Sequence, residues 1–376
     1  MHIVIVGAGI LGASAAFHLA RAGARVTVID QAHDGRATAA GAGIICPWVS
    51  GTDDPDFYRL YAEAARYYTE LVPQLDSEDL GYRRVGAMVV SNDTAELTAI
   101  RAMLDKRRAD NPEMGAVSLL APHEARALFP PLRDDLAALH VAGGARVDGR
   151  RMAAGLLNAA QRHGATLCDG HADLAVSHGR VVGVSLDGQA IAADQVIVAA
   201  GAWAPALLEP LGIALSIEPQ RGQIVHMRLP GQDTGAWPVV LPPGSHYLLA
   251  FDDSRVVVGA TRETGAGFDY RVTAMGQAQV LAEALHIAPG LGGATIIETR
   301  VGFRPVGAGV RPMLGLVHGI EGLLIGNGLG AAGLTIGPFA GRVLADAAMG
   351  HSTPFDLAPF APLQRGPSSV RVPPLR

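Results

Sequence analysis

The first thirty residues show the hydrophobic pattern of a strand, a helix and a second strand. Residues 2–6 form a short apolar run, residues 10–22 are small and mostly apolar, and residues 25–30 form a second apolar run that ends at Asp30. Continuously apolar strands on both sides of a helix are typical of a parallel sheet whose two faces are covered. The chain therefore begins with a predicted βαβ unit.

Further along, helical periodicity alternates with short apolar runs and with alternating runs. Helices are predicted at residues 58–75, 94–108, 152–163 and 333–349. Strands are predicted at residues 82–91, 173–176, 180–186, 189–192, 194–199 and 322–325, and further strands within 215–319. The pairs His178-Gly179 and Asp187-Gly188 are typical of hairpin turns and predict a three-stranded meander over residues 173–192.

This order predicts an α/β fold of two domains that share the chain in alternation. One is an interrupted, Rossmann-like, nucleotide-binding domain, and the other is a substrate domain built on a mixed β-sheet. The nucleotide-binding domain is assigned residues 1–52, 147–214 and 320–352, the substrate domain residues 53–146 and 215–319, and an extended tail residues 353–376. The tail is rich in proline and has no periodicity.

Composition narrows the possible functions. Of the 376 residues, 49% are apolar and 17% are charged, which is typical of a chain with a large folded core. The net charge of −5 gives no basic surface for nucleic acid. Lys106 is the only lysine and lies in a charged run, which disfavours a pyridoxal-phosphate enzyme with a sheltered Schiff-base lysine.

Cysteine usage and uncharged segments bear on the compartment. Cys46 and Cys168 form neither a disulfide framework nor a CxxC pair, so no metal site is predicted and the cytoplasm is the expected location. Residues 1–20 and 322–341 are uncharged, but the first lacks the basic start of a signal peptide, and the second contains seven glycines. Neither is predicted to span a membrane, and the second suits buried backbone that lines a ligand.

The turn after the first strand has the pattern of a dinucleotide site. Gly7, Gly9 and Gly12 form GxGxxG between the predicted strand and helix, where the tight turn and the helix N-terminus can accept a pyrophosphate. Asp30 ends the second strand, where its carboxylate can bind ribose hydroxyls and would repel a 2′-phosphate. Because the βαβ start is interrupted and a meander precedes the strand at 194–199, FAD is favoured over NAD.

Five motifs in order resemble those of the D-amino-acid oxidase family of FAD-dependent oxidoreductases, which includes glycine oxidase, sarcosine oxidase and D-amino-acid dehydrogenases. They lie at residues 35–44, 196–203, 219–223 (Pro-Gln-Arg-Gly-Gln), 302–305 (Gly-Phe-Arg-Pro) and 330–341. The resemblance covers nearly the whole chain before the tail. It implies noncovalent FAD bound at Gly7, Gly9, Ile10, Leu11, Gly12, Asp30, Gln31, Thr38, Ala39, Ala42, Gly43, Ile44, Asp173, Ala200, Gly201, Trp203, Gly330, Gly333, Leu334 and Thr335.

Two departures from the family pattern concern the substrate. Arg311 precedes Pro312 where the family usually has an acidic residue, and Ala331 stands where glycine oxidase has a further arginine. The resemblance therefore supports the family more than a glycine-specific enzyme. Aromatic hydroxylases and disulfide reductases fit less well, because the chain contains no Gly-Asp pair and no suitably spaced cysteines.

An amino-acid substrate needs a cation for its carboxylate, and arginine binds a carboxylate best. The resemblance implies that Arg304, in Gly-Phe-Arg-Pro, and Tyr247 position that carboxylate. The alternatives are a structural ion pair for Arg304 and a core or surface aromatic for Tyr247. His246 is expected on the opposite strand face with a structural role. Arg221 is expected to brace the backbone, and Cys46 to be a buried thiol that does not tether the flavin.

The prediction is an FAD-dependent amino-acid or amine oxidase or dehydrogenase. It oxidises a D-amino acid, a glycine-like substrate or a secondary amine to an imino acid by hydride transfer from Cα to flavin N5, with oxygen or a quinone as acceptor. Two alternatives stay open: a same-fold FAD oxidoreductase of 2-hydroxy acids, and a non-catalytic flavin-binding subunit of a larger complex. Peripheral membrane association is expected only of a dehydrogenase, and a homo-oligomer is compatible with each.

Overall fold

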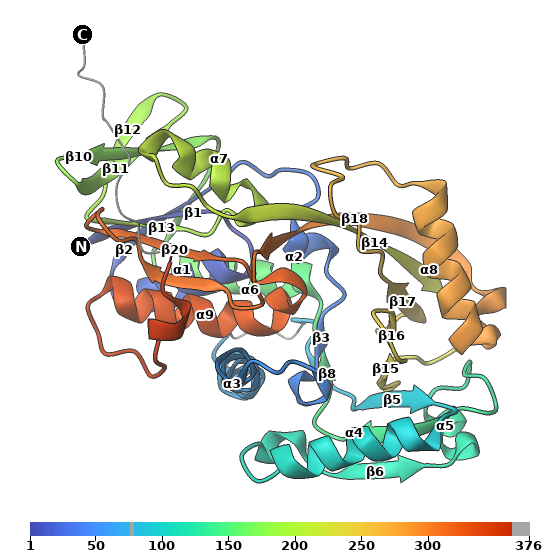
Figure 1. Cartoon of the computed structure of the whole chain (residues 1–376). Coiled ribbons are helices and arrows are strands. Elements are labelled where there is room, and N and C mark those ends of the chain that lie inside the picture. The colour runs from blue at the N-terminus through green and yellow to red at the C-terminus, as the bar shows by residue number, and fades with distance from the viewer. Residues whose placement is uncertain (76–78, 363–376) are drawn as a thin grey trace.

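The computed structural model describes residues 1–75 and 79–362, in which two parts share the chain in alternation (Figure 1). One part is built on a six-stranded sheet and the other on an eight-stranded sheet. Two three-stranded sheets complete the strand pairing of the described residues. The predicted two-domain α/β fold is confirmed.

The six-stranded sheet contains five parallel strands and one antiparallel edge strand, β19. Its order is β19 (Met313–Leu316), β20 (Leu323–Asn327), β13 (Gln195–Val198), β1 (His2–Val6), β2 (Arg25–Asp30) and β9 (Thr166–Asp169). β1 thus lies in the interior of the sheet, and the turn that follows it opens between β2 and β13.

Both faces of this sheet are covered, which explains why its strands are apolar throughout. Ile3 and Ile5 share a core with three helices, α1 (Ile10–Arg21), α6 (Gly149–Arg162) and α9 (Gly333–Ala348). Val4 and Val6 point the other way, into a core shared with a three-stranded antiparallel sheet. That sheet consists of β10 (Ala172–Ser177), β11 (Arg180–Leu186) and β12 (Gln189–Ala192).

The eight-stranded sheet joins strands from two distant stretches of the chain. Its order is β18 (Thr295–Gly307), β14 (Ile217–Arg228), β17 (Arg255–Gly259), β16 (Tyr247–Ala250), β15 (Val239–Leu241), β5 (Ala87–Ser91), β7 (Ala137–Val141) and β6 (Val117–Leu120). Neighbouring strands are antiparallel except β15 and β5. The helices α4 (Thr94–Arg107), α5 (Pro122–Leu128) and α8 (Ala274–Ile287) lie in this part of the molecule (Figure 1).

Short elements connect the two parts. The second three-stranded sheet has the order β3 (Ile44–Ile45), β8 (Ala145–Arg146) and β4 (Arg83–Arg84). The remaining α-helices are α2 (Ala37–Ala40), α3 (Pro55–Leu71) and α7 (Ala204–Leu208). The 3₁₀ turns are η1 (Pro47–Val49), η2 (Val72–Gln74), η3 (Pro112–Met114), η4 (Gly201–Trp203), η5 (Glu209–Leu211), η6 (Pro289–Gly293), η7 (Gly330–Ala332) and η8 (Ala358–Phe360). The long strands β14 and β18 extend from the eight-stranded sheet towards α2, and Phe303 donates its N–H to the Gly35 carbonyl over 2.8 Å.

Helices α1 and α9 approach each other unusually closely because glycines face the contact. A Cβ atom at Gly341 would lie 2.5 Å from the Leu11 carbonyl oxygen, and one at Gly337 would lie 2.6 Å from Ile10 Cγ2. The Ser14 hydroxyl also donates to the Pro338 carbonyl over 2.6 Å. The glycine-rich segment 322–341 therefore serves helix packing, and within the described residues no helix is long and apolar enough to cross a membrane.

Pro338 lies inside α9 and removes one N–H from the helix. The carbonyl that this N–H would have bonded belongs to Leu334, four residues earlier. The fully buried Tyr68 hydroxyl donates a hydrogen bond to that carbonyl instead. A side chain of α3 thus satisfies the backbone of the first turn of α9.

Most of the predicted elements are present, with shifted ends. The meander matches β10 to β12, and His178 and Asp187 both have positive φ at its turns. The predicted strand at 82–91 is divided into β4 and β5. The helix predicted from residue 152 begins at Gly149, because the Asp148 carboxylate accepts the N–H groups of Arg150 and Arg151.

Two segments differ from the sequence-based assignment. β19 falls in the range 215–319 that was assigned to the substrate domain, yet it pairs with β20 in the six-stranded sheet. Residues 353–362 were expected to be an extended tail, but Phe355 and Phe360 are buried against each other, and Phe355 also contacts Phe339 of α9. Two aromatic anchors therefore hold this stretch, while residues 363–376 of the predicted tail lie outside the described residues.

Candidate active site

A cavity of about 1000 Å³ lies where the two parts of the molecule meet. Its walls come from the carboxyl end of β1, the first turn of α1, the end of β2, the loop around α2, the turn after β13, and strands of the eight-stranded sheet. The turn before α9 closes another side. The cavity thus collects the segments that the five sequence motifs had marked.

The glycine turn after β1 has the close packing that its motif requires. Gly7 has a φ of +108°, and a Cβ there would lie 2.4 Å from the Ala199 carbonyl oxygen. At Gly12 a Cβ would meet the Gly7 oxygen at 1.9 Å. Gly9 faces the cavity, where a Cβ would have only Thr38 Oγ1 near it, at 3.3 Å. This backbone is therefore open to a ligand.

The first turn of α1 presents its N–H groups near the cavity. The Ile10 N–H donates to Thr38 Oγ1 over 3.0 Å, and Ile10 and Leu11 both line the cavity. N–H groups in the first turn of a helix have no acceptor within the helix, and the helix dipole makes this end positive. This end of the cavity therefore suits an anion such as a phosphate.

Asp30 is fixed at the end of β2. One carboxylate oxygen accepts the Ala8 N–H and the other accepts the Ala32 N–H, both over 2.6 Å. The Arg36 guanidinium lies 3.3 Å from the carboxylate. Close by, the ring of His171 lies 3.1 Å from the Gln31 side-chain oxygen and 3.2 Å from the Asp173 carboxylate. Asp30, Gln31 and Asp173 all line the cavity.

The turn after β13 forms the middle of the cavity wall. Gly201 has a φ of +53°, and its carbonyl accepts a hydrogen bond of 2.8 Å from the buried Asn327 side chain. Trp203 stacks on His33, with ring centroids 4.6 Å apart. Ala200, Gly201 and Trp203 line the cavity as predicted, whereas Asn327 was not singled out from the sequence.

Of the twenty predicted cofactor residues, seventeen line the cavity. Gly12, Ala39 and Thr335 do not, and each has a structural contact instead. Gly12 packs on Gly7, the Ala39 carbonyl accepts a 2.9 Å hydrogen bond from Arg150, and the Thr335 hydroxyl donates to the Ile44 carbonyl over 3.0 Å. A direct ligand contact is therefore not proposed for these three side chains.

Arg304 lies at the other end of the cavity, where its guanidinium packs directly against the backbone of Gly222. Gly222 pairs with Gly302 across β14 and β18, and a Cβ at Gly222 would lie 2.5 to 2.7 Å from the Arg304 guanidinium. The Arg304 Nη1 group donates to the Thr261 carbonyl over 3.1 Å. The glycine of Pro-Gln-Arg-Gly-Gln is thus required by the arginine of Gly-Phe-Arg-Pro.

Tyr247 reaches the same end of the cavity from β16. A Cβ at Gly259 would lie 2.7 Å from the Tyr247 hydroxyl, so this glycine makes room for the tyrosine. Burial raises the pKa of Tyr247, and the positive charges of Arg304 and Arg262 only partly oppose this. Tyr247 is therefore a protonated hydrogen-bond donor at neutral pH. Burial likewise lowers the pKa of Arg304, whose guanidinium still remains charged.

Two cavity residues were not recognised as site residues from the sequence. Arg262 lines the cavity close enough to shift the pKa values of Tyr247 and Arg304. His246 also lines the cavity, and its Nε2 atom has no hydrogen-bond partner among the described residues. His246 and Tyr247 were expected on opposite strand faces, yet both line the cavity; β16 begins at Tyr247, so strand alternation does not extend to His246.

Arg221 and Cys46 are placed largely as the sequence suggested. Arg221 does not line the cavity and pairs with Glu263 and Asp269. Cys46 is buried, and burial raises the pKa of its thiol to about 12. This thiol is protonated at neutral pH and is a poor nucleophile, which favours noncovalent binding of a cofactor.

The family model for FAD-dependent oxidoreductases (DAO) matches residues 2–347. The chain belongs to this family. It is an FAD-dependent oxidoreductase, as the sequence motifs predicted. Among the described residues, no group of three or more histidine, cysteine or acidic side chains is arranged to hold a metal ion.

Known relatives of this FAD-dependent oxidoreductase cover nearly the whole chain. It is 49% identical to an uncharacterised oxidoreductase of Bacillus subtilis over 96% of this chain and 98% of the other. It is 31% identical to a glycine oxidase of Pseudomonas aeruginosa over 96% and 99% of the two chains. The crystal structure of iminodiacetate oxidase from Chelativorans sp. BNC1 has 56% sequence identity and a TM-score of 0.94, covering 96% of this chain and 98% of that chain.

The cavity fits FAD at both of its helix N-termini. The first turn of α1 and the exposed backbone of Gly9 suit the pyrophosphate, and Asp30 suits the ribose of the adenosine. At the start of α9, Gly330 and Gly333 line the cavity, and a Cβ at Gly330 would have no atom within 4 Å. Free N–H groups and the positive helix end there suit the electron-rich edge of a flavin.

Replacing Asp30 by alanine is expected to weaken FAD binding at least tenfold. The ribose would lose a charged acceptor worth about 1.5–3 kcal/mol for each hydrogen bond. Asp169→Ala is the matched control, since Asp169 pairs with Asp30 at the end of the neighbouring strand but does not line the cavity. Fluorescence titration of the apoprotein with FAD measures both dissociation constants, and equal affinities for the two variants would contradict the role of Asp30.

Proposed function

We propose that this FAD-dependent oxidoreductase oxidises a small amino acid at the bond between Cα and nitrogen, and that its preferred substrate is a secondary amine with two carboxylates. Iminodiacetate is the simplest such compound. The observation that carries the proposal is a pair of arginines, Arg304 and Arg262, at one end of the cavity. Neither forms an ion pair with a carboxylate of the described residues.

Arg304 is the arginine that gains most from an anionic partner. Partial removal from water and the nearby charge of Arg262 both lower the pKa of Arg304. A carboxylate bound between the forked N–H donors of Arg304 and the Tyr247 hydroxyl would relieve this cost. A second carboxylate on the same substrate could pair with the exposed side chain of Arg262, which lines the cavity.

The substrate Cα, which is bonded to the amine nitrogen, must then face the flavin. FAD held by the glycine turn and Asp30 would supply the acceptor for a hydride from the substrate Cα. Arg304 and Tyr247 contribute by fixing one carboxylate, and Arg262 by fixing the other, so that rotation of the substrate is restricted. Ile224 and Leu241 also line the cavity and give it apolar walls, which strengthens these charge interactions.

The relatives support an amine substrate. The solved structure with 56% identity is that of an iminodiacetate oxidase, and several curated relatives are glycine oxidases. The cavity itself fits a 2-hydroxy acid less well, since a monocarboxylate of that kind would leave Arg262 without a partner. A subunit that only relays electrons would have no use for a half-buried arginine that lines the cavity without an acidic partner among the described residues.

Anaerobic titration with a panel of compounds tests the proposed reaction. Iminodiacetate is expected to bleach the flavin absorbance faster than sarcosine, glycine or D-alanine at equal concentration, because only iminodiacetate engages both arginines. Bleaching by glycolate or lactate, and by no amine, would contradict the amine assignment and support oxidation of a 2-hydroxy acid.

Variants of the first carboxylate site should follow a fixed order of severity. Arg304→Ala is expected to cost about 2–5 kcal/mol in kcat/KM, because a carboxylate loses its buried partner. Arg304→Lys keeps the charge but not the planar fork and should recover part of this loss. Tyr247→Phe removes one neutral hydrogen bond and should cost about 0.5–1.5 kcal/mol. FAD content should stay unchanged in all three, and wild-type kinetics in Arg304→Ala would place the carboxylate elsewhere.

Replacing Arg262 by glutamine should change substrate preference. We expect the KM for iminodiacetate to rise roughly tenfold, since one charge-assisted contact worth about 1.5–3 kcal/mol is lost, while the KM for sarcosine changes little. Arg271→Gln is a matched control on the same loop, because Arg271 is 83% exposed, pairs with Asp269 and does not line the cavity. Equal losses for both substrates in Arg262→Gln would argue against a second carboxylate site.

A further inference from the structure

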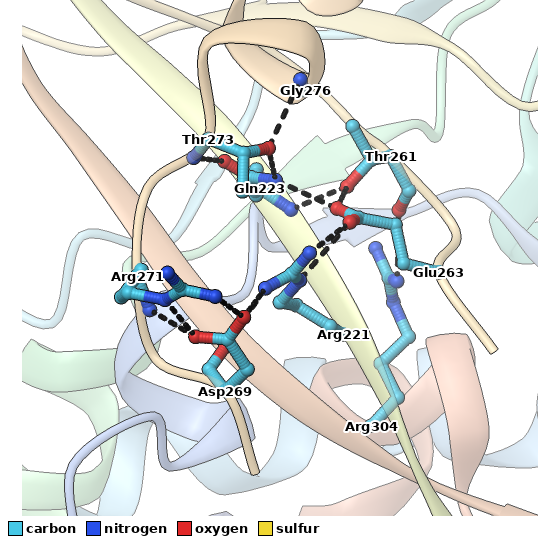
Figure 2. Close-up of polar contacts among 9 residues, drawn as sticks. All are labelled: Arg221, Gln223, Thr261, Glu263, Asp269, Arg271, Thr273, Gly276 and Arg304. Carbon is cyan, nitrogen blue, oxygen red and sulfur yellow. Dashed lines mark hydrogen bonds and ion pairs between the residues drawn. The ribbon is translucent and has the colours of Figure 1, made fainter. Parts of the chain in front are cut away.

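A continuous polar network lies next to Arg304 (Figure 2), and, apart from Arg304, the side chains drawn there do not line the cavity. It connects β14 to the segment of residues 261–273, which runs from β17 to α8 and is called the strap below. Arg262 belongs to the strap and lines the cavity, whereas Glu263, the next residue, does not. The network therefore joins the substrate end of the cavity to groups that no substrate touches.

Glu263 is the centre of this network. Its Oε1 atom accepts hydrogen bonds from the Thr261 hydroxyl and from Gln223 Nε2, both over 2.7 Å. Its Oε2 atom accepts a hydrogen bond of 3.0 Å from Arg221 Nε and a second hydrogen bond from Arg221 Nη2. Partial burial works to raise the pKa of Glu263, but the hydrogen bonds from Arg221, Thr261 and Gln223 together lower it. The carboxylate is ionised and engaged by four donors.

Thr261 transmits this arrangement to Arg304. The Thr261 hydroxyl donates to Glu263 and accepts the Gln223 backbone N–H over 2.9 Å, so both its side chain and its position are fixed. The carbonyl of the same residue accepts the Arg304 Nη1 group over 3.1 Å. Glu263 thus bonds the hydroxyl of the same residue whose carbonyl holds Arg304, and the Thr261 N–H also donates to the Gln223 carbonyl over 3.2 Å.

The backbone of Arg262 is held between the same two residues. Thr261 is fixed by its hydroxyl, and Glu263 pairs with Arg221 through two backbone hydrogen bonds of 2.9 and 3.1 Å. Both arginines that face the cavity therefore depend on the strap at this point. Arg304 depends on it through a carbonyl, and Arg262 through its own main chain.

The far half of the strap is held through Asp269 and Thr273, which share the partners Arg221 and Gln223 with Glu263. Asp269 lies 2.7 Å from Arg221 Nη1, and Figure 2 shows Arg221 between the carboxylates of Glu263 and Asp269. Thr273 donates its N–H to Gln223 over 3.0 Å and caps α8 through the Gly276 N–H at 3.2 Å. Because Asp269 has no hydrogen bond to Thr261, it secures the strap without contacting the groups that hold Arg304.

We propose that Glu263 is a positioning residue for substrate binding: its carboxylate fixes Thr261, and through the Thr261 carbonyl it orients Arg304 and the adjoining Arg262 towards the substrate carboxylates. The inference rests on the proposed function in that it assigns carboxylates to these two arginines. It differs from a general stabilising role of the strap, which Glu263 and Asp269 would share.

Binding of two simple anions to the FAD-loaded full chain separates these roles. Acetate can occupy only one carboxylate site, whereas malonate can reach both arginines, and the flavin absorbance reports the binding of either. Glu263→Gln keeps the shape of the side chain but turns one acceptor into a donor facing other donors. We expect it to weaken acetate and malonate binding roughly tenfold, to raise KM much more than it lowers kcat, and to leave FAD content unchanged.

Two further variants make the outcome specific. Thr261→Val removes the hydroxyl on which Glu263 acts, so it should weaken acetate binding by a similar factor. The double variant should be hardly weaker than either single one, because both remove the same coupling. Asp269→Asn, which loosens the strap away from Thr261, should change acetate affinity less than about twofold even if it lowers the melting temperature as much as Glu263→Gln.

The contrary results are equally distinct. Wild-type acetate affinity in Glu263→Gln, additive losses in the double variant, or equal losses in Asp269→Asn and Glu263→Gln would overturn the positioning role. If the wild-type protein binds malonate no tighter than acetate and does not oxidise iminodiacetate, the two-carboxylate function fails, while a tenfold loss of acetate affinity in Glu263→Gln still supports the positioning role. A wild-type protein that binds neither anion would overturn both.

Discussion

The close contact between α1 and α9 is the constraint on which the site depends most. The N-termini of both helices reach one cavity because their axes approach at Gly337 and Gly341, where a Cβ would meet the atoms of α1 at 2.5 to 2.6 Å. A wider separation would move one positive helix end away from the other. One end suits a pyrophosphate and the other the electron-rich edge of a flavin, so glycine packing sets the distance between the two helix ends that would hold FAD.

The substrate end of the cavity depends on a different device, the paired strands β14 and β18. Their register places Gly222 opposite Gly302 and leaves the guanidinium of Arg304 lying on the strand surface. The same pair of strands reaches from the eight-stranded sheet to the loop at Gly35, where Phe303 bonds the backbone. β18 thus carries Arg304, the proposed carboxylate-binding group, to the cavity-lining loop at Gly35.

The sequence predicts the parts of the site that depend on local chemistry. GxGxxG with Asp30, the hairpin turns and the apolar strands each follow from a spacing of a few residues, and the structure contains them. Arg262 and His246, whose Nε2 atom has no hydrogen-bond partner among the described residues, could not be identified in this way, because their roles depend on which strands become neighbours. The packing of Phe355 and Phe360 and the pairing of β19 were missed for the same reason. Gly222 illustrates both cases. The sequence motif identifies this residue, but its contact with Arg304 becomes evident only from the register of β14 and β18.

Charge balance around the strap connects these observations. The strap network contains two carboxylates, Glu263 and Asp269, and two guanidinium groups, Arg221 and Arg271, which pair with one another. Arg304 and Arg262 are left with no acidic partner among the described residues, although two carboxylates lie close behind them. Because the hydrogen bonds of Glu263 and Asp269 are taken up by Arg221 and its neighbours, these acids hold the strap in place without occupying the cavity's cations. The cavity therefore keeps two positive charges available, the same number as the carboxylates of the proposed iminodiacetate-like substrate.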